Sequence, residues 1–311
     1  RFDLIGIYHT SAVKDWGNYM NNTKFPDRML LMYGEPWNGY ATDNEESQKV
    51  RMSAVSSLTS AKVGVFNGKY RQSLKGSNDT GKRGYIFNQN EDDGTAYAAN
   101  IAVGLKGSLT SLDKSNCSDT SGTWTRFFAG TPDQSINYIS AHDNLCLWDK
   151  IKEAGVTGDY AQRIVKFGHG ILLTSQGIPF IHAGDEFLRT KHKGAGSAMA
   201  HNSYMAGIKT NSIDWSLKST NNGIFKYHSD LIKLRKDNDG LRYRNGTGTT
   251  EVAGNAVKYY VQNTNGTKLC IVVNPGNNMS APVSGTKIFD IYGATPKSSD
   301  CEGTAVTVIK Y

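Results

Sequence analysis

The chain has 311 residues, of which 38% are hydrophobic and 20% are charged, and its formal net charge is +7. This composition is typical of a folded protein with one large and one small domain, and the even spread of lysine and arginine argues against a nucleic-acid partner. No run approaches the roughly 20 apolar residues that cross a bilayer, so no membrane partner is expected either.

Short apolar runs alternate with helical patterns up to about residue 238, which is the signature of repeated β-α units. The first residues, 1–5, predict the end of one strand, and four more strands are predicted at 29–34, 62–66, 136–141 and 178–183. A parallel barrel needs eight strands, because an open sheet leaves unpaired edges and an unfilled interior. We therefore expect an α/β fold in which residues 1–238 form strands four to eight of a TIM barrel. A companion polypeptide is expected to supply the N-terminal barrel strands.

Two amphipathic helices are predicted in this part of the chain. Apolar or small side chains recur at helical spacing between 159 and 175, and again between 224 and 236 with Gly240 beyond the end. The segment 76–135 is rich in Gly, Asn, Asp and Ser and shows little periodicity. We expect helix fragments and long loops there, lying over the loop face of the barrel, where barrel enzymes place their specificity elements.

The pattern changes after Leu241. Strand-like runs at 257–261, 268–273 and 305–309 are separated by Gly, Asn and Thr turns. We expect residues 239–311 to form a small antiparallel β-sandwich domain.

The four cysteines, Cys117, Cys146, Cys270 and Cys301, show none of the spacings of a metal site, so no metal is predicted from them. Cys146 is expected to be a small packed residue. Cys270 and Cys301 fall in the same terminal region, which leaves a disulfide between them open. The bias of the loops toward Asn, Ser, Thr and Gly favours an extracellular or cell-surface bacterial protein and leaves the cytoplasm open.

Three carboxylates, Asp3, Glu35 and Asp143, each stand where an apolar run gives way to a polar loop. A carboxylate at the end of a buried strand is held rigidly, faces a cleft, and can have its pKa set by its surroundings. Three such positions in series predict an enzyme that breaks glycosidic bonds with acidic side chains. Taken singly, Asp3 also fits a solvated terminal residue, Glu35 a helix-start carboxylate, and His142-Asp143 a buried structural pair.

The sequence around these acids resembles the α-amylase superfamily, the family 13 glycoside hydrolases, and within it the type I pullulanases. Three segments resemble the motifs after the fourth, fifth and seventh barrel strands: Arg1-Phe2-Asp3-Leu4, Met32-Tyr33-Gly34-Glu35-Pro36-Trp37 and Tyr138-Ile139-Ser140-Ala141-His142-Asp143-Asn144. Further segments point toward pullulanases in particular: Phe66-Asn67 with Arg71, Gly177 through Lys191, Asn202-Ser203-Tyr204, and Asn211-Ser212-Ile213-Asp214-Trp215. Ile208 departs from the pattern, because the family usually has an acidic residue there.

The resemblance implies a retaining mechanism with Asp3 as the nucleophile and Glu35 as the general acid and base. Asp143 is expected to bind sugar hydroxyls more strongly in the transition state. Substrate contacts are expected from Arg1, His142, Trp37, Asn144, Asn202 and Tyr204. Arg1, two residues before Asp3, is also expected to keep that carboxylate ionised. No cofactor is expected for the chemistry, and calcium is left open.

The expected function is hydrolysis of α-1,6 branch linkages in an α-glucan such as pullulan, starch or glycogen fragments. One alternative is a general α-amylase or a glycogen debrancher that cuts other α-glucan linkages. The other is an inactive glucan-binding fragment that lacks the N-terminal barrel strands. Trp148 and Trp215 are expected to pack rather than to bind sugar, and His182 is left open between the core and the floor of the site.

Overall fold

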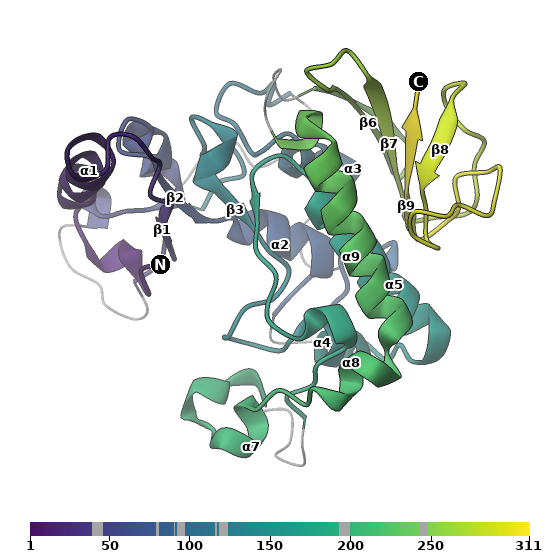
Figure 1. Cartoon of the computed structure of the whole chain (residues 1–311). Coiled ribbons are helices and arrows are strands. Elements are labelled where there is room, and N and C mark those ends of the chain that lie inside the picture. Colours follow the sequence, from purple (N-terminus) through teal and green to yellow (C-terminus); the bar gives the residue numbers. More distant parts are fainter. Residues whose placement is uncertain are drawn as a thin grey trace.

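The computed structural model describes residues 1–38, 46–78, 81–89, 91, 97–115, 117, 124–192, 200–242 and 248–311. Two sheets organise the described residues, a four-stranded parallel sheet and a five-stranded antiparallel one (Figure 1). The change from one to the other falls near residue 240, where the sequence pattern also changes. The structure thus has an α/β part followed by an antiparallel β part.

The parallel sheet holds β1 (Met32–Gly34), β2 (Val63–Phe66), β3 (Ser135–Asn137) and β4 (Ile178–Pro179) side by side in chain order. Phe2 adds a parallel bridge to Gly34 at the β1 edge. Four of the five predicted strands are therefore confirmed, in the order that successive β-α units produce, whereas residues 1–5 contribute only the bridge at Phe2. The ladders of β3 and β4 are shorter than predicted, because the chain beyond Asn137 and Pro179 turns into loops.

Helices connect and cover these strands. The described α-helices are α1 (Thr10–Asn18), α2 (Gly68–Lys75), α3 (Tyr97–Leu105), α4 (Leu147–Glu153), α5 (Gly158–Thr174), α7 (Ile208–Asn211), α8 (Ser216–Thr220) and α9 (Asn222–Asp237). The short 3-10 and π segments are η1 (Ile5–Ile7), the π-helical η2 (Tyr19–Lys24), η3 (Glu46–Gln48), η4 (Met52–Leu58), η5 (Tyr85–Phe87), η6 (Pro132–Gln134), η7 (Asp185–Phe187), η8 (Ser203–Met205) and η9 (Asp239–Arg242). The two predicted amphipathic helices are confirmed as α5 and α9. None of the described helices combines the length and the apolar composition that crossing a membrane requires.

The segment 76–135 contains the expected helix fragments, but one of them lies elsewhere than predicted. Its helix α3 does not lie over the loop face but packs between α2 and the edge of the antiparallel sheet formed by β5 and β6. The reason lies in its side chains, which are apolar on nearly every face and include the buried Ile101, Val103 and Leu105. A helix that is apolar all round belongs in the interior rather than on a loop surface.

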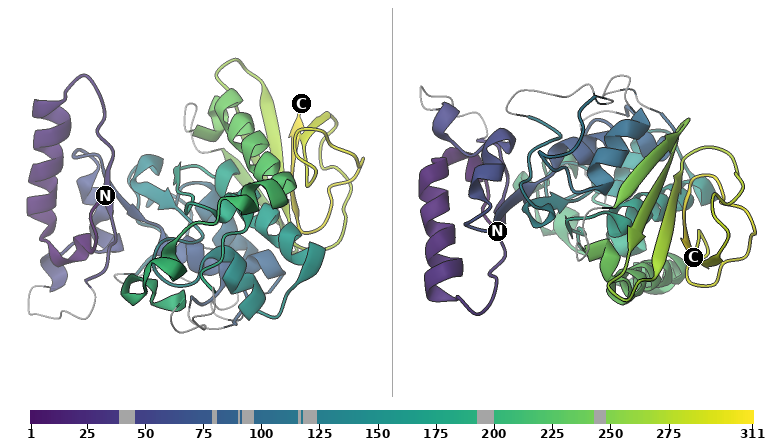
Figure 2. Two further views of the ribbon diagram at one scale, coloured as in Figure 1. Left: turned by 60° about the horizontal axis from the view of Figure 1, so that its bottom comes forward. Right: turned by 90° about the horizontal axis from the view of Figure 1, so that it is seen from above.

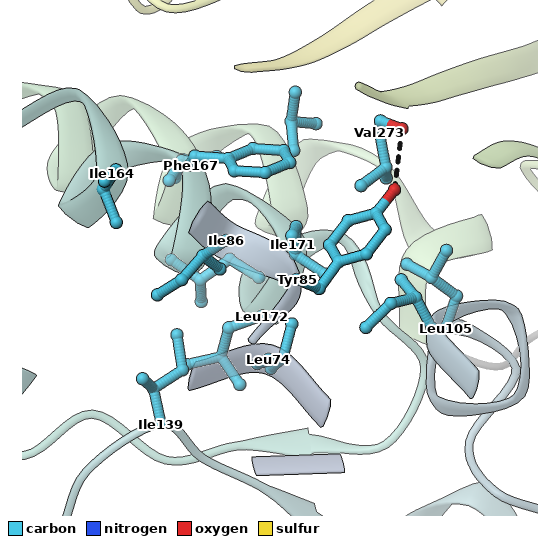
Figure 3. Packing of buried hydrophobic residues seen from close by; sticks show 14 of the residues in the cluster. Leu74, Tyr85, Ile86, Leu105, Ile139, Ile164, Phe167, Ile171, Leu172 and Val273 are labelled. Carbon is cyan, nitrogen blue, oxygen red and sulfur yellow. Dashed lines mark hydrogen bonds between the residues drawn. The ribbon is translucent and has the colours of Figure 1, made fainter. Parts of the chain in front are cut away.

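The antiparallel sheet has the order β5 (Thr249–Ala253), β6 (Ala256–Gln262), β7 (Lys268–Asn274), β9 (Ala305–Lys310), β8 (Thr286–Phe289). One face packs on α5 and α3, and one continuous apolar core joins the two parts of the chain. Figure 3 shows Tyr85 reaching from η5 toward β7, where its hydroxyl donates to the carbonyl of Val273 at 3.2 Å. The terminal sheet therefore shares its core with the helices of the parallel sheet.

The other face of this sheet carries a smaller cluster of Cys270, Val272, Cys301 and Ile309, which Met279 helps to cover. Met279 and Cys301 pair through an isolated bridge, and no second sheet lies over this face among the residues that the structure describes. The antiparallel sheet is confirmed, while the second layer of the expected sandwich consists of these irregular segments. Cys270 and Cys301 are buried free thiols, and Cys146 is buried as expected.

Residues 1–66 supply most of a second core. Ile5 and Val13 meet β1, β2 and η4 there, together with Phe128 from further along the chain. Figure 2 shows α1 at one end of the molecule and the antiparallel sheet at the other. The parallel sheet lies between these two ends, and its loops carry the residues that the sequence singles out.

Candidate active site

Three of the predicted site segments meet where the strands of the parallel sheet end, at their carboxyl-terminal ends. Asp3 follows the bridge residue Phe2, Glu35 follows β1 directly, and His142 and Asp143 lie in the loop after β3. Because parallel strands end at the same edge of a sheet, these side chains converge although up to 140 positions separate them. The structure thus brings together the three predicted acids.

Arg1 lies between two of these acids. Its guanidinium is 3.0 Å from a carboxylate oxygen of Asp3 and donates a hydrogen bond of 2.6 Å to Glu35. The Nε2 atom of His142 is 3.3 Å from Asp143 and 3.9 Å from Asp3. One oxygen of Asp3, one oxygen of Glu35 and one ring nitrogen of His142 all lie within 4.8 Å of one another. Five charged or ionisable groups therefore lie close together.

The carboxylates of Asp3 and Glu35 have different environments. The Glu35 side chain is only 4% exposed, whereas the Asp3 side chain is 64% exposed. Burial raises the pKa of Glu35, and the negative charges of Asp3 and Asp143 add to that rise, while the Leu4 N–H and the Arg1 cation oppose it. Two neighbouring carboxyls in such unequal surroundings favour one protonated and one ionised form at the same pH.

The backbone around Glu35 explains how the two acids come so close. A side chain at Gly34 would meet the Phe2 carbonyl oxygen and the Ile5 Cβ at 2.7 Å each, so only glycine allows the first segment to pair this tightly with β1. Leu4 adopts a left-handed conformation with φ 46°. Its N–H then donates to the Glu35 carboxylate at 3.0 Å. Strained backbone of this kind is concentrated at functional sites.

A pocket of about 250 Å³ opens beside Glu35 and Asp143. Trp37 and Asn144, both predicted to contact substrate, line it. The rings of Trp37 and Trp124 stand 5.9 Å apart at 60° across the pocket wall. Aromatic walls with polar groups between them suit the apolar faces and hydroxyl rims of a sugar.

Three residues of this pocket were missed by sequence reasoning: Trp124, Arg71 and Asn78. Arg71 was noted only for its place in a motif, yet its guanidinium stacks 5.1 Å from the ring centroid of Tyr138. The Nε atom of Arg71 and the Oδ1 atom of Asn78 are buried without a hydrogen-bond partner in the structure. Trp124 and Asn78 lie in the aperiodic segment, which offered no signal that could have found them.

Four of the six predicted substrate contacts do not line this pocket, namely Arg1, His142, Asn202 and Tyr204. The last of these, Tyr204, is 69% exposed. The hydroxyl of Ser203, which lies between Asn202 and Tyr204, donates to the His142 carbonyl at 3.2 Å. The segment therefore contacts the site through Ser203 and the His142 backbone.

Trp148, Trp215 and His182 are candidates for packing as well as for sugar binding. Trp148 packs against the main core, and Trp215 stands 5.6 Å from the Phe187 ring but is largely exposed. His182 is buried next to Arg189 and Asp185, so it belongs to the interior beneath the site.

The acids of the site could also bind a metal ion. Within the described ranges, Asp3, Glu35 and His142 form the group whose ligand atoms are close enough to share one ion. The guanidinium of Arg1 already places a cation between Asp3 and Glu35.

Comparison with known proteins identifies relatives of this chain in sequence and in structure. No model of a known protein family matches the chain. The pullulanase of Bacillus subtilis (strain 168) is 31% identical over 250 residues, which is 78% of this chain and 30% of that protein. The relatives of this chain are pullulanases. Their identity confirms the resemblance that the site motifs indicate.

Solved pullulanase structures share the fold. The pullulanase from Bacillus acidopullulyticus superposes with a TM-score of 0.81 at 25% identity, covering all of this chain and 37% of that one. A pullulanase from Paenibacillus barengoltzii, in complex with maltohexaose and alpha-cyclodextrin, gives a TM-score of 0.79 at 26% identity, covering all of this chain and 47% of that one. The chain therefore spans less than half the length of these relatives.

Proposed function

We propose that this chain is the part of a retaining glycoside hydrolase that carries the catalytic acids, and that the complete barrel cleaves α-1,6 branch linkages in α-glucans. In this proposal, residues 1–238 are strands four to eight of the barrel and residues 239–311 are its terminal antiparallel β-domain. The observation that carries it is the placement of Asp3 and Glu35 within 4.8 Å of each other, one exposed and one buried.

The short separation supports a retaining rather than an inverting reaction. Retaining enzymes hold their two carboxyls about 5–5.5 Å apart, whereas inverting enzymes leave about 6.5–9.5 Å for a water molecule. Asp3 attacks the anomeric carbon while Glu35, whose pKa is raised by burial, protonates the departing glycosidic oxygen. Water then attacks the covalent intermediate and Glu35 takes its proton. Each of the two steps inverts the configuration at the anomeric carbon, so the product keeps the original configuration.

The remaining groups of the site act on charge and orientation. Asp143 accepts hydrogen bonds from sugar hydroxyls as the ring flattens toward an oxocarbenium ion, and His142, 3.3 Å away, donates to the same sugar. Arg1 holds both carboxylates in place and limits how far the pKa of Glu35 rises. Trp37 and Trp124 offer rings on which glucose faces stack. The glucan seen in the Paenibacillus barengoltzii relative supports this class of ligand.

We further propose that a polypeptide segment supplying the earlier barrel strands covers one apolar groove. This groove has a volume of about 810 Å³, and apolar side chains line most of it, among them Phe2, Trp16, Tyr19, Met20, Leu30, Leu31 and Met32. It adjoins the edge of the parallel sheet at Phe2, whose described pairing is with Gly34 on one side. A parallel sheet is normally covered on both faces and closed at its edges.

The decisive experiment is product analysis with the assembled barrel, which means this chain together with the polypeptide that supplies the earlier barrel strands. Pullulan cut to maltotriose is expected, with little attack on unbranched amylose, and the Asp3→Asn variant serves as the inactive control. Attack on amylose at a comparable rate would instead favour an α-amylase. Glucan binding without any product would favour the inactive binding fragment.

A further inference from the structure

The loop that carries His142 and Asp143 has an unusual backbone. Asn144 adopts a left-handed conformation with φ 61°, which few residues other than glycine and asparagine tolerate. This turn directs the carbonyl groups of His142 and Asn144 into the protein rather than toward solvent. Carbonyl groups that face the interior need hydrogen-bond donors there, because an unpaired buried polar group costs free energy.

Lys191 supplies both donors from another part of the chain. Its Nζ atom donates to the His142 carbonyl at 2.5 Å and to the Asn144 carbonyl at 2.7 Å. The lysine is only 1% exposed, so its own side of these two bonds is shielded from water. A buried ammonium persists only when its donors are satisfied, which makes both bonds important to the loop and to the lysine alike.

Asp149 fixes the segment that presents this lysine. The Lys191 N–H donates to Asp149 Oδ2 at 2.7 Å, and the Thr190 hydroxyl donates to the other oxygen of the same carboxylate. The thiol of Cys146 donates to Asp149 Oδ2 at 3.0 Å. Asp149 lies in the first turn of α4, just after the loop. The loop after β3, the start of α4 and the segment after β4 are thus bound into one unit.

Charge favours the same arrangement. Burial lowers the pKa of Lys191, and the negative charges of Asp143 and Asp149 oppose that decrease. Both carboxylates therefore favour the charged form of this lysine, while the Arg189 cation disfavours it. Ser203, which donates to the His142 carbonyl at 3.2 Å, adds a weaker contact to the same atom.

We propose that Lys191 is a positioning residue: by holding the carbonyls of His142 and Asn144, its ammonium sets where His142 and Asp143 stand relative to Asp3 and Glu35. This inference rests on the proposed glycosidase function. Lys191 itself contacts none of the carboxylates that would react, so it acts through the loop. Without it, the 3.3 Å contact between His142 and Asp143 and the 3.9 Å approach to Asp3 lose their support.

The test compares three variants of the assembled barrel with pullulan as substrate. Lys191→Met is expected to lower kcat about 100-fold with little change in KM, because a displacement of about 1 Å at a reacting centre has an effect of that size. Lys191→Arg keeps a cation that can donate to carbonyls and is expected to recover about tenfold of that loss. Lys150→Met is the matched control, since Lys150 is equally buried and donates to the Lys82 carbonyl at 2.6 Å, away from this loop.

Lys150→Met is expected to keep kcat within about threefold of the original protein, since it also removes a buried ammonium but leaves the two bonds to the His142 and Asn144 carbonyls in place. Equal losses of kcat in Lys191→Met and Lys150→Met would overturn the proposal, because the effect would then be general destabilisation. A loss confined to KM would overturn it as well. If Lys191→Met does not fold, the comparison of Lys191→Arg with Lys150→Met decides in the same way.

A measurement that needs no activity separates this inference from the proposed function. In ¹⁵N-labelled protein, the ring signals of His142 are expected to shift or broaden in the Lys191 variants and to stay unchanged in Lys150→Met. If the original protein fails to hydrolyse pullulan, the proposed function is wrong, while these signals still report on the loop. Unchanged His142 signals in both Lys191 variants would show that the loop holds its place without the ammonium.

Discussion

Residues 1–66 and the rest of the chain differ in how their apolar side chains are covered. In the later part, one core runs from the helices of the parallel sheet into the antiparallel sheet, and Phe167 and Phe289 are fully buried in it. The earlier part supplies most of a smaller core beside a groove where Trp16, Tyr19 and Leu31 remain exposed. The later part is closed by its own chain, and the earlier part is not.

This difference matters because the candidate site draws on both parts. Asp3 and Glu35 belong to the earlier part, whereas His142 and Asp143 belong to the later one. The later part binds its loop through Lys191 and Asp149. The pair that would perform the chemistry therefore stands on the part of the molecule that carries the open apolar groove.

The largest expected effect is the loss of turnover when either acid of that pair is neutralised. Asp3→Asn removes the nucleophile and Glu35→Gln removes the proton donor, and each is expected to lower kcat by at least about 10⁴-fold while glucan binding persists. Rates with pullulan and binding of maltotriose measure the two effects separately. Retention of near-normal turnover by either variant would contradict the role given to that residue.

Acids away from the site supply the controls for these variants. Asp133→Asn alters an acid in η6, at the opposite end of the strands, and Glu153→Gln alters an acid at the end of α4. Both are expected to keep kcat close to that of the original protein. They show whether an amide in place of a carboxylate is harmful in itself.

The next effect concerns stability and tests the contrast between the two parts directly. Phe167→Ala is expected to lower the free energy of unfolding by about 3–5 kcal/mol, both in the assembled barrel and in this chain alone, because it leaves a cavity in the closed core. Tyr19→Asp places a charge in the apolar groove and is expected to destabilise only the assembled barrel, by about 2 kcal/mol, since the side chain is 55% exposed in this chain. Urea unfolding of both forms measures these changes.

Tyr160→Asp is the matched control, because Tyr160 is a similarly exposed helical tyrosine that lies on α5, far from the groove. It is expected to change neither form appreciably. If Tyr19→Asp and Tyr160→Asp had the same small effect in the assembled barrel, the groove would not be the surface that the covering segment uses.

The sequence sufficed for features that depend on local pattern. Period and apolar runs placed β1 and β2 and the helices α5 and α9, and the strand-end position of Glu35 pointed to the site. Features that depend on contacts between distant segments were not readable. Trp124 lies in a segment without periodicity, α3 was given the wrong surroundings, and the pairing of Lys191 with the loop at His142 spans 49 positions. Nothing near Lys191 in the chain marks it as buried.

The smallest effect concerns the pH dependence of activity and sharpens the link between the two acids. The general acid must be protonated, so kcat/KM falls as the pH rises past the pKa of Glu35 in the free enzyme. Arg1 lowers that pKa because its cation favours the carboxylate 2.6 Å away, while burial raises it. Removing the cation in Arg1→Met therefore raises the pKa further, and the fall in kcat/KM moves to higher pH.

Profiles of kcat/KM against pH measure this shift, with Arg28→Met as the control. Arg28 is exposed and its guanidinium lies over the Phe25 ring, so its loss is expected to leave the profile unchanged. A shift of the alkaline limb to lower pH in Arg1→Met would mean that another group, and not Glu35, must carry the proton. Such a result would separate the chemistry from the burial of Glu35, which is the property that distinguishes it from its exposed neighbour Asp3.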